Sequence, residues 1–194
     1  TNWQAGPAQP EQAPGKRPPN VIVILADDMG INDLSMNGGH DGITTPNIDA
    51  LAKAGASFDN GYAGSAVCTI SRAALLTGRY PWRFGVEFTP TPGAMARVAP
   101  MLYDSDPPPF IDQRLAREAK PFNDLGLPNS EVTLAERLKP LGYHNVHIGK
   151  WHLGSTPEMR PNAQGFDETV FMESGLYLPV DHPEVVNSRQ DFDP

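Results

Sequence analysis

The stretch from Cys68 to Arg72 is the segment whose residue types and spacing most readily do chemistry. Cys68 is the single cysteine of the chain, and Arg72 follows it by one helical turn, on the same face of a helix. A guanidinium beside a sulfur at the positive end of a helix favours a thiolate or another anion. Two plainer readings stay open: a lone thiol is often inert packing, and Arg72 can be a surface ion-pair partner.

Asp27 and Asp28 form a second candidate, directly after the apolar run at residues 21–26. Ligand sites of open α/β sheets lie at the carboxyl ends of strands, which is where this pair is expected. Adjacent carboxylates repel each other unless a cation intervenes, and hard oxygen ligands suit Ca²⁺ or Mg²⁺ better than zinc. Two Asp side chains supply at most four of the roughly 6–8 oxygens of a calcium site, so other ligands must contribute. Alternatively, one carboxylate caps a turn and the other is solvated.

Lys150 and His152 form a third candidate, after a strand-like run at residues 143–148. At the same edge of a sheet, Lys150 can bind an anionic oxygen and His152 can donate a proton. Their position separates them from the remaining histidines, for which a solvated or backbone-bonded role fits better. Those remaining histidines are His40, His144, His147 and His182.

Two expected strands position the second and third of these groups, and a helix follows the first strand. The continuous apolar run at 21–26 predicts a fully buried strand of a parallel sheet, and residues 143–148 predict a second strand. Thr45 as N-cap and Pro46 at the first helical position predict a helix that ends at Gly55. Ile48, Leu51 and Ala52 would form its apolar face.

Two further helices complete the expected framework. One begins close to Cys68 and ends at Gly78, and the other is capped by Ser130 and ends at Gly142. The apolar positions of the latter are Val132, Leu134, Ala135, Leu138 and Leu141. Together the pattern predicts an α/β fold with a mixed, largely parallel central sheet flanked by helices. We expect this fold to be incomplete in the chain, because no closing element follows Phe166.

The distribution of proline along the chain divides it further. Residues 1–19 predict a proline-rich arm, and residues 20–194 carry all the candidate residues, with an irregular insertion at about 89–128 and a possible short helix at 112–119. The net charge of −8 offers no basic stripe for nucleic acid. No apolar run approaches the roughly 18 residues of a membrane span. No signal-peptide pattern opens the chain, so a signal was either removed or never present.

Four segments resemble the sulfatase family, more narrowly the formylglycine-dependent, arylsulfatase-like members of the alkaline phosphatase superfamily. Residues 68–79 resemble the sulfatase signature, in which a Cys or Ser leads into a helix that ends Leu-Thr-Gly-Arg. Residues 19–30 resemble the opening strand and metal carboxylates, residues 44–49 the next helix entry, and residues 142–154 the second signature. These segments stand in the family's order, so residues 20–194 are identified as the N-terminal part of a sulfatase catalytic domain.

The resemblance implies a role for each candidate residue. Cys68 would be the modified residue, converted to formylglycine, whose hydrated aldehyde supplies the nucleophilic oxygen. Asp27 and Asp28 would bind Ca²⁺, with the converted Cys68 as a further metal ligand and Mg²⁺ as the less favoured ion. Arg72 would hold the hydrate, and Lys150 and His152 would be substrate-binding and catalytic residues at the sulfate and its leaving side.

The implied reaction is attack by one hydrate hydroxyl on sulfur with departure of the alcohol, followed by release of sulfate as the second hydroxyl collapses to the aldehyde. Two departures from the family bear on it. Ile70 stands where Pro or Ala is usual in sequences read by the formylglycine-generating machinery. The further His, Asp-Asn pair and Lys that the family draws from its later half have no match after His152, so this chain alone is expected to be inactive.

The expected partners are a sulfated small molecule or carbohydrate, the remaining half of the catalytic domain on the same or a separate chain, and the formylglycine-generating machinery. The resemblance also implies a periplasmic, secreted or lysosomal location. Two other functions stay open. A phosphodiester or phosphonate ester hydrolase would use the same geometry, and a sulfatase-like binding protein without turnover would account for Ile70 and the missing later half.

Overall fold

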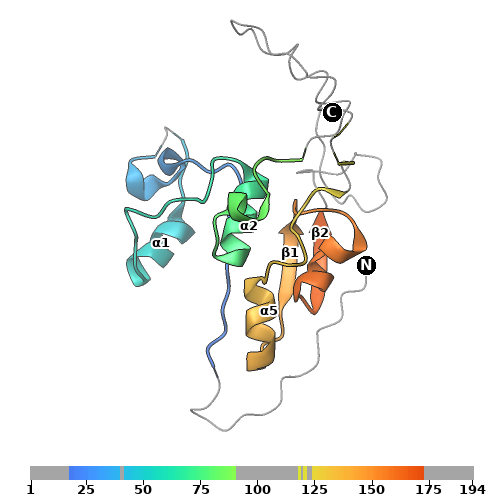
Figure 1. Ribbon diagram of the computed structural model, residues 1–194. Helices are drawn as coiled ribbons and strands as arrows, with labels where there is room; N and C mark the ends of the chain where they lie inside the picture. The colour runs from blue at the N-terminus through green and yellow to red at the C-terminus, as the bar shows by residue number, and fades with distance from the viewer. Residues whose placement is uncertain (1–17, 40–41, 91–117, 119, 122–123, 173–194) are drawn as a thin grey trace, which may run out of the picture. The chain divides into compact units, whose positions relative to one another are not determined.

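The computed structural model describes residues 18–39, 42–90, 118, 120–121 and 124–172 (Figure 1). The chain divides into two compact units, residues 1–62 and 63–194. Most of the predicted arm at 1–19, most of the insertion at 89–128 and nearly all of the possible helix at 112–119 lie outside the described residues.

The first unit contains the 3-10 turns η1 (Ile31–Asp33) and η2 (Ser35–Asn37) and helix α1 (Pro46–Ala54). The predicted bounds of α1 are confirmed, because Thr45 is its N-cap, Pro46 its first residue and Gly55 its C-cap. The Thr45 hydroxyl donates to Asp49 Oδ1 at 2.9 Å, and the Ser35 hydroxyl donates to Asp49 Oδ2 at 2.8 Å. This network fastens the start of α1 to η2. The predicted apolar face is not buried, since Ile48 and Leu51 are exposed.

The prediction of a buried strand at residues 21–26 is wrong for this structure. The segment is assigned to no strand, and Ile22 and Ile24 are 84% and 83% exposed. A fully buried strand needs hydrogen-bonding neighbours and a layer over each face. The described part of the first unit contains no strand that could pair with it. An apolar run therefore marks the ability to become a buried strand, whereas burial itself depends on neighbours.

The second unit is built on a parallel pair of strands, β1 (Val146–Lys150) and β2 (Glu168–Met172), with Val146 opposite Glu168. The crossover between them contains the 3-10 turns η6 (Pro157–Met159) and η7 (Pro161–Gln164). The strand predicted at 143–148 thus begins and ends later in the chain. Asn145 precedes it, and its buried side-chain amide donates to the carbonyls of Ala135 and Gly165.

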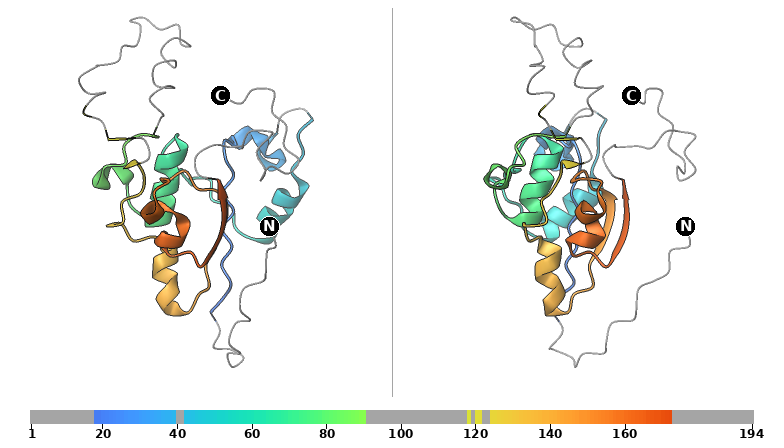
Figure 2. Two further views of the ribbon diagram at one scale, coloured as in Figure 1. Left: turned by 90° about the vertical axis from the view of Figure 1, so that its right-hand side faces the viewer. Right: turned by 45° about the vertical axis from the view of Figure 1, so that its right-hand side comes forward.

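Helices α2 (Cys68–Thr77) and α5 (Leu134–Leu138) lie on the same side of this strand pair (Figures 1 and 2). Helix α2 ends at the predicted stop, Gly78, which adopts a left-handed C-cap conformation with φ of 66°. It is followed by the 3-10 turn η3 (Pro81–Phe84). Helix α5 continues through η5 (Lys139–Leu141) to the predicted stop at Gly142.

The N-cap predicted for α5 is corrected from Ser130 to Thr133. The Thr133 hydroxyl accepts a hydrogen bond from Glu136 N at 3.2 Å, and the Glu136 carboxylate accepts one from Thr133 N at 2.8 Å. This reciprocal pair is a capping box, which satisfies two backbone donors at the helix start. Ser130 is exposed and lies ahead of this box. The helix is therefore shorter than its apolar pattern predicted.

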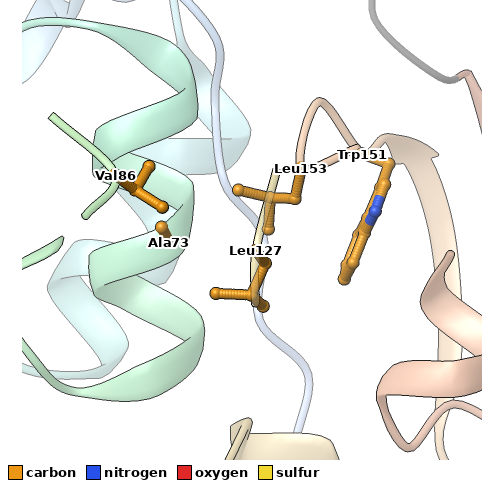
Figure 3. Packing of buried hydrophobic residues seen from close by; sticks show 5 residues of the cluster. All are labelled: Ala73, Val86, Leu127, Trp151 and Leu153. Atoms are coloured by element: carbon orange, nitrogen blue, oxygen red, sulfur yellow. The ribbon is translucent and has the colours of Figure 1, made fainter. Parts of the chain in front are cut away.

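The core of the second unit joins α2 to the segment that follows β1. Figure 3 shows its five buried side chains: Ala73, Val86, Leu127, Trp151 and Leu153. Phe171 of β2 packs against this cluster, so one face of the strand pair is turned to the core. The opposite face carries three exposed apolar residues, Val146, Ile148 and Val170.

Candidate active site

Cys68 is the first residue of α2, directly after the extended N-cap residue Val67. Its side chain is half-buried, and the thiol is free. Thr69, Ile70 and Ala73 are buried, so this face of α2 fixes the helix in the unit. The backbone N–H groups of the first turn have no intrahelical acceptors and carry a partial positive charge. Cys68 therefore lies where an anionic sulfur or oxygen is stabilised.

Arg72 connects the two sequence segments that carry the candidate residues. Its Nη1 donates a hydrogen bond of 2.6 Å to the carbonyl oxygen of Lys150, across 78 residues of sequence. Lys150 is the last residue of β1, rather than a residue beyond the strand. The hydrogen bond thus brings α2 and the carboxyl end of β1 together, whereas the sequence had placed only Lys150 and His152, with Asp27 and Asp28, at that edge of the sheet.

The backbone around Lys150 and His152 is held by its neighbours in the chain. Trp151 and Leu153 are buried in the core (Figure 3), and the Trp151 indole N–H donates to the carbonyl of Met159 at 2.8 Å. His152 adopts a left-handed conformation with φ of 58°, which non-glycine residues adopt uncommonly. Lys150 and His152 are half-buried and alternate with the two core residues. Their side chains therefore extend from a backbone that the core anchors.

Glycines permit the path of this segment. Gly154 has φ of 112°, and a Cβ there would lie 2.5 Å from the sulfur of Met159. Gly126 lies close to the segment as well, since a Cβ there would lie 2.3 Å from the carbonyl oxygen of Leu153. The tight packing explains why small residues stand at both positions.

His147 contacts this segment through the ring of Trp151. The sequence predicted only a solvated or backbone-bonded role for it. It lies on β1, and its pKa is lowered by burial and, second, by the positive charge of Arg72. Its ring meets Trp151 edge-on at 5.2 Å. The alternation along β1 places His147 on the face opposite to Val146 and Ile148. That alternation was the sequence signal that could have identified it.

Arg79, the last residue of the signature stretch, has a structural role. It pairs with the carboxylate of Glu131, which is buried, and its guanidinium lies 5.6 Å from the centre of the Phe84 ring. The pair ties the end of α2 to the segment before α5. The signature therefore contains residues that hold α2 in place as well as residues suited to chemistry.

Asp27 and Asp28 belong to the first unit, at the end of the extended apolar segment. Asp27 is half-buried, and Asp28 is exposed with a left-handed φ of 53°. Two neighbouring carboxylates suit an oxygen-seeking cation. Within the described ranges, no group of three or more His, Cys, Asp or Glu residues is arranged to hold a metal. The pair supplies oxygen ligands of the kind that such a cation binds, and both calcium binding and the relation to Cys68 stay predictions.

The sulfatase family model matches residues 19–190 of this chain. The N-acetylgalactosamine-6-sulfatase of Mus musculus is 41% identical over 152 residues, which are 78% of this chain and 25% of that protein. Arylsulfatase A of Homo sapiens is also 41% identical over 152 residues, covering 77% of this chain and 24% of that protein. The chain thus spans about a quarter of the length of these curated relatives.

Solved structures agree with these relatives. The crystal structure of Ps i-CgsB is similar with a TM-score of 0.60 and 36% identity, over 78% of this chain and 27% of that one. The PsFucS1 sulfatase from Pseudoalteromonas sp. is similar with a TM-score of 0.60 and 33% identity, over 81% of this chain and 26% of that one. With the parallel β1–β2 pair, these similarities confirm the predicted α/β fold class and its incompleteness in this chain.

Proposed function

Because this chain belongs to the sulfatase family, we propose that it forms part of a sulfuric ester hydrolase whose nucleophile derives from Cys68. Relatives at about 40% identity support hydrolysis of sulfate esters. The chain corresponds to a quarter of their length, so the activity is proposed for the complete catalytic domain. The matched region contains every residue to which we assign a role.

The hydrogen bond between Arg72 and the Lys150 carbonyl is the observation that carries this proposal. It joins the helix that begins with Cys68 to the strand end that bears Lys150 and leads to His152. A nucleophile, two cations and a proton donor on neighbouring elements form the set needed to cleave an ester of a tetrahedral anion.

Each residue has a distinct task in the net reaction, in which water and a sulfate monoester yield an alcohol and sulfate. Formylglycine, formed from Cys68, would supply the nucleophilic oxygen. Arg72 orients that oxygen, and its guanidinium stabilises negative charge beside the helix N-terminus. Lys150 binds a sulfate oxygen, where its charge stabilises the charge that develops in the transition state. His152 donates a proton to the departing alcohol oxygen.

Asp27 and Asp28 would hold Ca²⁺, together with the converted Cys68 and ligands from outside this chain. Their adjacent carboxylates support this assignment, since they repel each other without a cation. When bound, the ion would polarise sulfate oxygens as a Lewis acid. The carboxylates themselves keep the ion at the end of the segment 21–26.

The proposed substrate is a sulfated carbohydrate or a sulfated small molecule. One similar solved structure is described as a complex with k-i-k-neocarrahexaose, which supports a carbohydrate. The proposed protein partners are the rest of the catalytic domain and the formylglycine-generating machinery, and the proposed location is periplasmic, secreted or lysosomal. Among the residues that the structure describes, no helix is long and apolar enough to cross a membrane.

Mass spectrometry of the tryptic peptide 54–72 tests the nucleophile directly. We expect an aldehyde or its hydrate at Cys68 in active enzyme, and the Cys68→Ala variant provides the unreactive reference. A wholly unmodified thiol in active enzyme would contradict the proposal.

Rates on matched sulfate and phosphate esters decide between the sulfatase and the phosphodiester or phosphonate hydrolase. Sulfate released by the complete protein excludes a binding protein without turnover.

A further inference from the structure

Tyr80 and Trp82 form an exposed aromatic pair where α2 leads into η3. Their ring centres lie 4.5 Å apart with 17° between the planes, so the rings are stacked. The two residues are 58% and 55% exposed. Each ring therefore covers one face of the other, while more than half of each residue stays accessible. A contiguous aromatic patch of this kind, unlike a single exposed apolar side chain, indicates a binding surface.

The backbone that carries this pair is anchored on both sides. Pro81, between the two aromatic residues, is fully buried, and Val86 lies in the core beside Ala73 of α2 (Figure 3). Val86 N donates to the Pro81 carbonyl at 3.1 Å. Arg79, directly before the pair, is paired with the buried carboxylate of Glu131. The rings are thus positioned before a ligand arrives, which lowers the entropic cost of binding.

Charged residues adjoin the aromatic pair. Arg83 follows Trp82 on η3, and both Arg83 and Glu87 are exposed. Charged side chains are seldom fully buried unless they are paired, so this stretch suits contact with solvent. By contrast, the exposed face of the β1–β2 pair carries valine and isoleucine, which are typical of a covered sheet. The aromatic pair therefore suits a hydrated ligand better than a further layer of the fold.

A carbohydrate has the chemistry that such a surface recognises. One face of a pyranose ring consists largely of C–H groups, whose positively polarised hydrogens pack against the negative face of an aromatic ring. The hydroxyl groups at the edge of the sugar stay in water, so no closed apolar pocket is needed. A sulfate group on the sugar is complementary in charge to the guanidinium of Arg83, which can bind it through two parallel hydrogen bonds.

We propose that Tyr80 and Trp82 form a binding surface for a pyranose ring of a sulfated carbohydrate chain, with Arg83 binding a sulfate group of that chain. The ten residues of α2 span about 15 Å, with Cys68 at the first end and the aromatic pair beyond the other. The surface therefore holds a part of the chain remote from the ester that is cleaved. Stacking is independent of the reaction, whereas the choice of a sulfated sugar rests on the proposed function.

Calorimetry on the complete protein tests the surface in the Cys68→Ala background, where no turnover occurs. The probes are a galactan hexasaccharide and its sulfated form, because stacking uses a C–H face that pyranoses share. Trp82→Ala should weaken the binding of both probes about tenfold, the effect of one lost stacking contact. Trp82→Phe should retain most of the affinity. Phe88→Ala, at a residue that is 71% exposed outside the pair, is the matched control. Equal affinities in Trp82→Ala and Phe88→Ala, or no binding of either probe, would overturn the inference.

Two further measurements separate charge from stacking and locate the site. Arg83→Gln should weaken only the binding of the sulfated probe, and a higher salt concentration should have the same effect. In hydroxyl-radical footprinting of the complete protein, Trp82 should be oxidised readily and become protected by either probe, with the buried Trp151 as the unreactive reference. A Trp82 that resists oxidation without sugar is covered by the rest of the domain, which rules the surface out. Because these readouts need no turnover, a lack of sulfatase activity counts against the proposed function alone.

Discussion

At the scale of single residues, Arg72 makes one observed long-range contact and has one proposed task, to orient the nucleophile formed at Cys68. It lies one turn after Cys68 on α2, and it donates to the Lys150 carbonyl at the end of β1. A planar guanidinium can make both kinds of contact at once because it presents several donors in fixed directions. A lysine at this position would keep the charge and lose that geometry.

We therefore expect Arg72→Lys to lower kcat/KM of the complete enzyme about 100-fold or more, the range measured when one oriented donor is removed from an active site. Steady-state kinetics on a sulfate ester provide the measurement. Arg137→Lys is the matched control, since Arg137 is exposed on α5. Equal losses in both variants would show that Arg72 has no special role.

Asp27 and Asp28 permit a prediction on metal binding. Asp27→Asn and Asp28→Asn should each weaken calcium binding, as measured by calorimetry on the complete protein. Calcium should also raise the melting temperature of the parent protein and leave that of the variants nearly unchanged, because a ligand bound only by the native state stabilises it. Asp59→Asn, at an exposed position, is the control. Unchanged calcium content in both variants would remove the pair from the site.

At the scale of elements, local chemistry decides where helices begin. Helix α5 starts at the capping box of Thr133 and Glu136, three residues after the predicted cap. The Thr133 hydroxyl also donates to the carbonyl of Gln164 at 2.7 Å, and the side chain is fully buried. One residue thus caps α5 and fastens it to the crossover between β1 and β2.

Thr133→Ala should lower the free energy of unfolding by about 1–3 kcal/mol, because it removes a cap and leaves a buried carbonyl without its donor. Urea denaturation measures the change. Ser130→Ala is the matched control and should have almost no effect. A larger loss of unfolding free energy in the Ser130→Ala variant would show that Ser130 is the N-cap, as the sequence predicted.

Asp167 is expected to make the stability of the strand pair depend on pH. The backbone N–H of Asn145 and the ammonium of Lys139 lower the pKa of Asp167 below its ordinary value of 3.8. Because the folded-state pKa is depressed, the contribution to stability is complete above the unfolded-state pKa and is lost as pH falls through the folded-state pKa. As the pH is lowered, the urea midpoint of unfolding should therefore fall, and Asp167→Asn should reduce this fall. An unchanged fall of the midpoint in this variant would exclude Asp167 as its cause. Asp124→Asn, at an exposed position, is the control.

At the scale of the whole molecule, each unit exposes apolar side chains of the kind that usually lie in a protein core. Ile22 and Ile24 in the first unit are 84% and 83% exposed, and Ile148 in the second is 75% exposed. Parallel strands are ordinarily covered on both faces. The chain also spans a quarter of the length of its curated relatives. The proposed partner for these surfaces is the remainder of the catalytic domain.

Hydrogen exchange tests this proposal. Amides of residues 21–26 and of β1 should exchange faster in this chain alone than in the complete protein, because pairing and burial protect backbone N–H groups. The buried helix start at Thr133 serves as the reference, with similar protection in both. Equal exchange of residues 21–26 in the two samples would contradict coverage by the remainder.

The sequence by itself determined the elements whose ends are encoded locally. Pro46 and Gly55 delimit α1, and Gly78 ends α2, because proline and glycine act through their own backbone conformations. The order of the signature segments was also sufficient to identify the family. These features depend on neighbours within a few residues, so the linear pattern contains them.

Only the tertiary structure decided which of these features meet. It placed Arg72 on the Lys150 carbonyl and the His147 ring against Trp151 and Phe166, and it left residues 21–26 exposed despite their apolar run. Burial and long-range contacts depend on which surfaces are present to pack against each other. A strand is buried by partners distant in the chain, and the Arg72 guanidinium finds its acceptor 78 residues away. No local pattern contains that information.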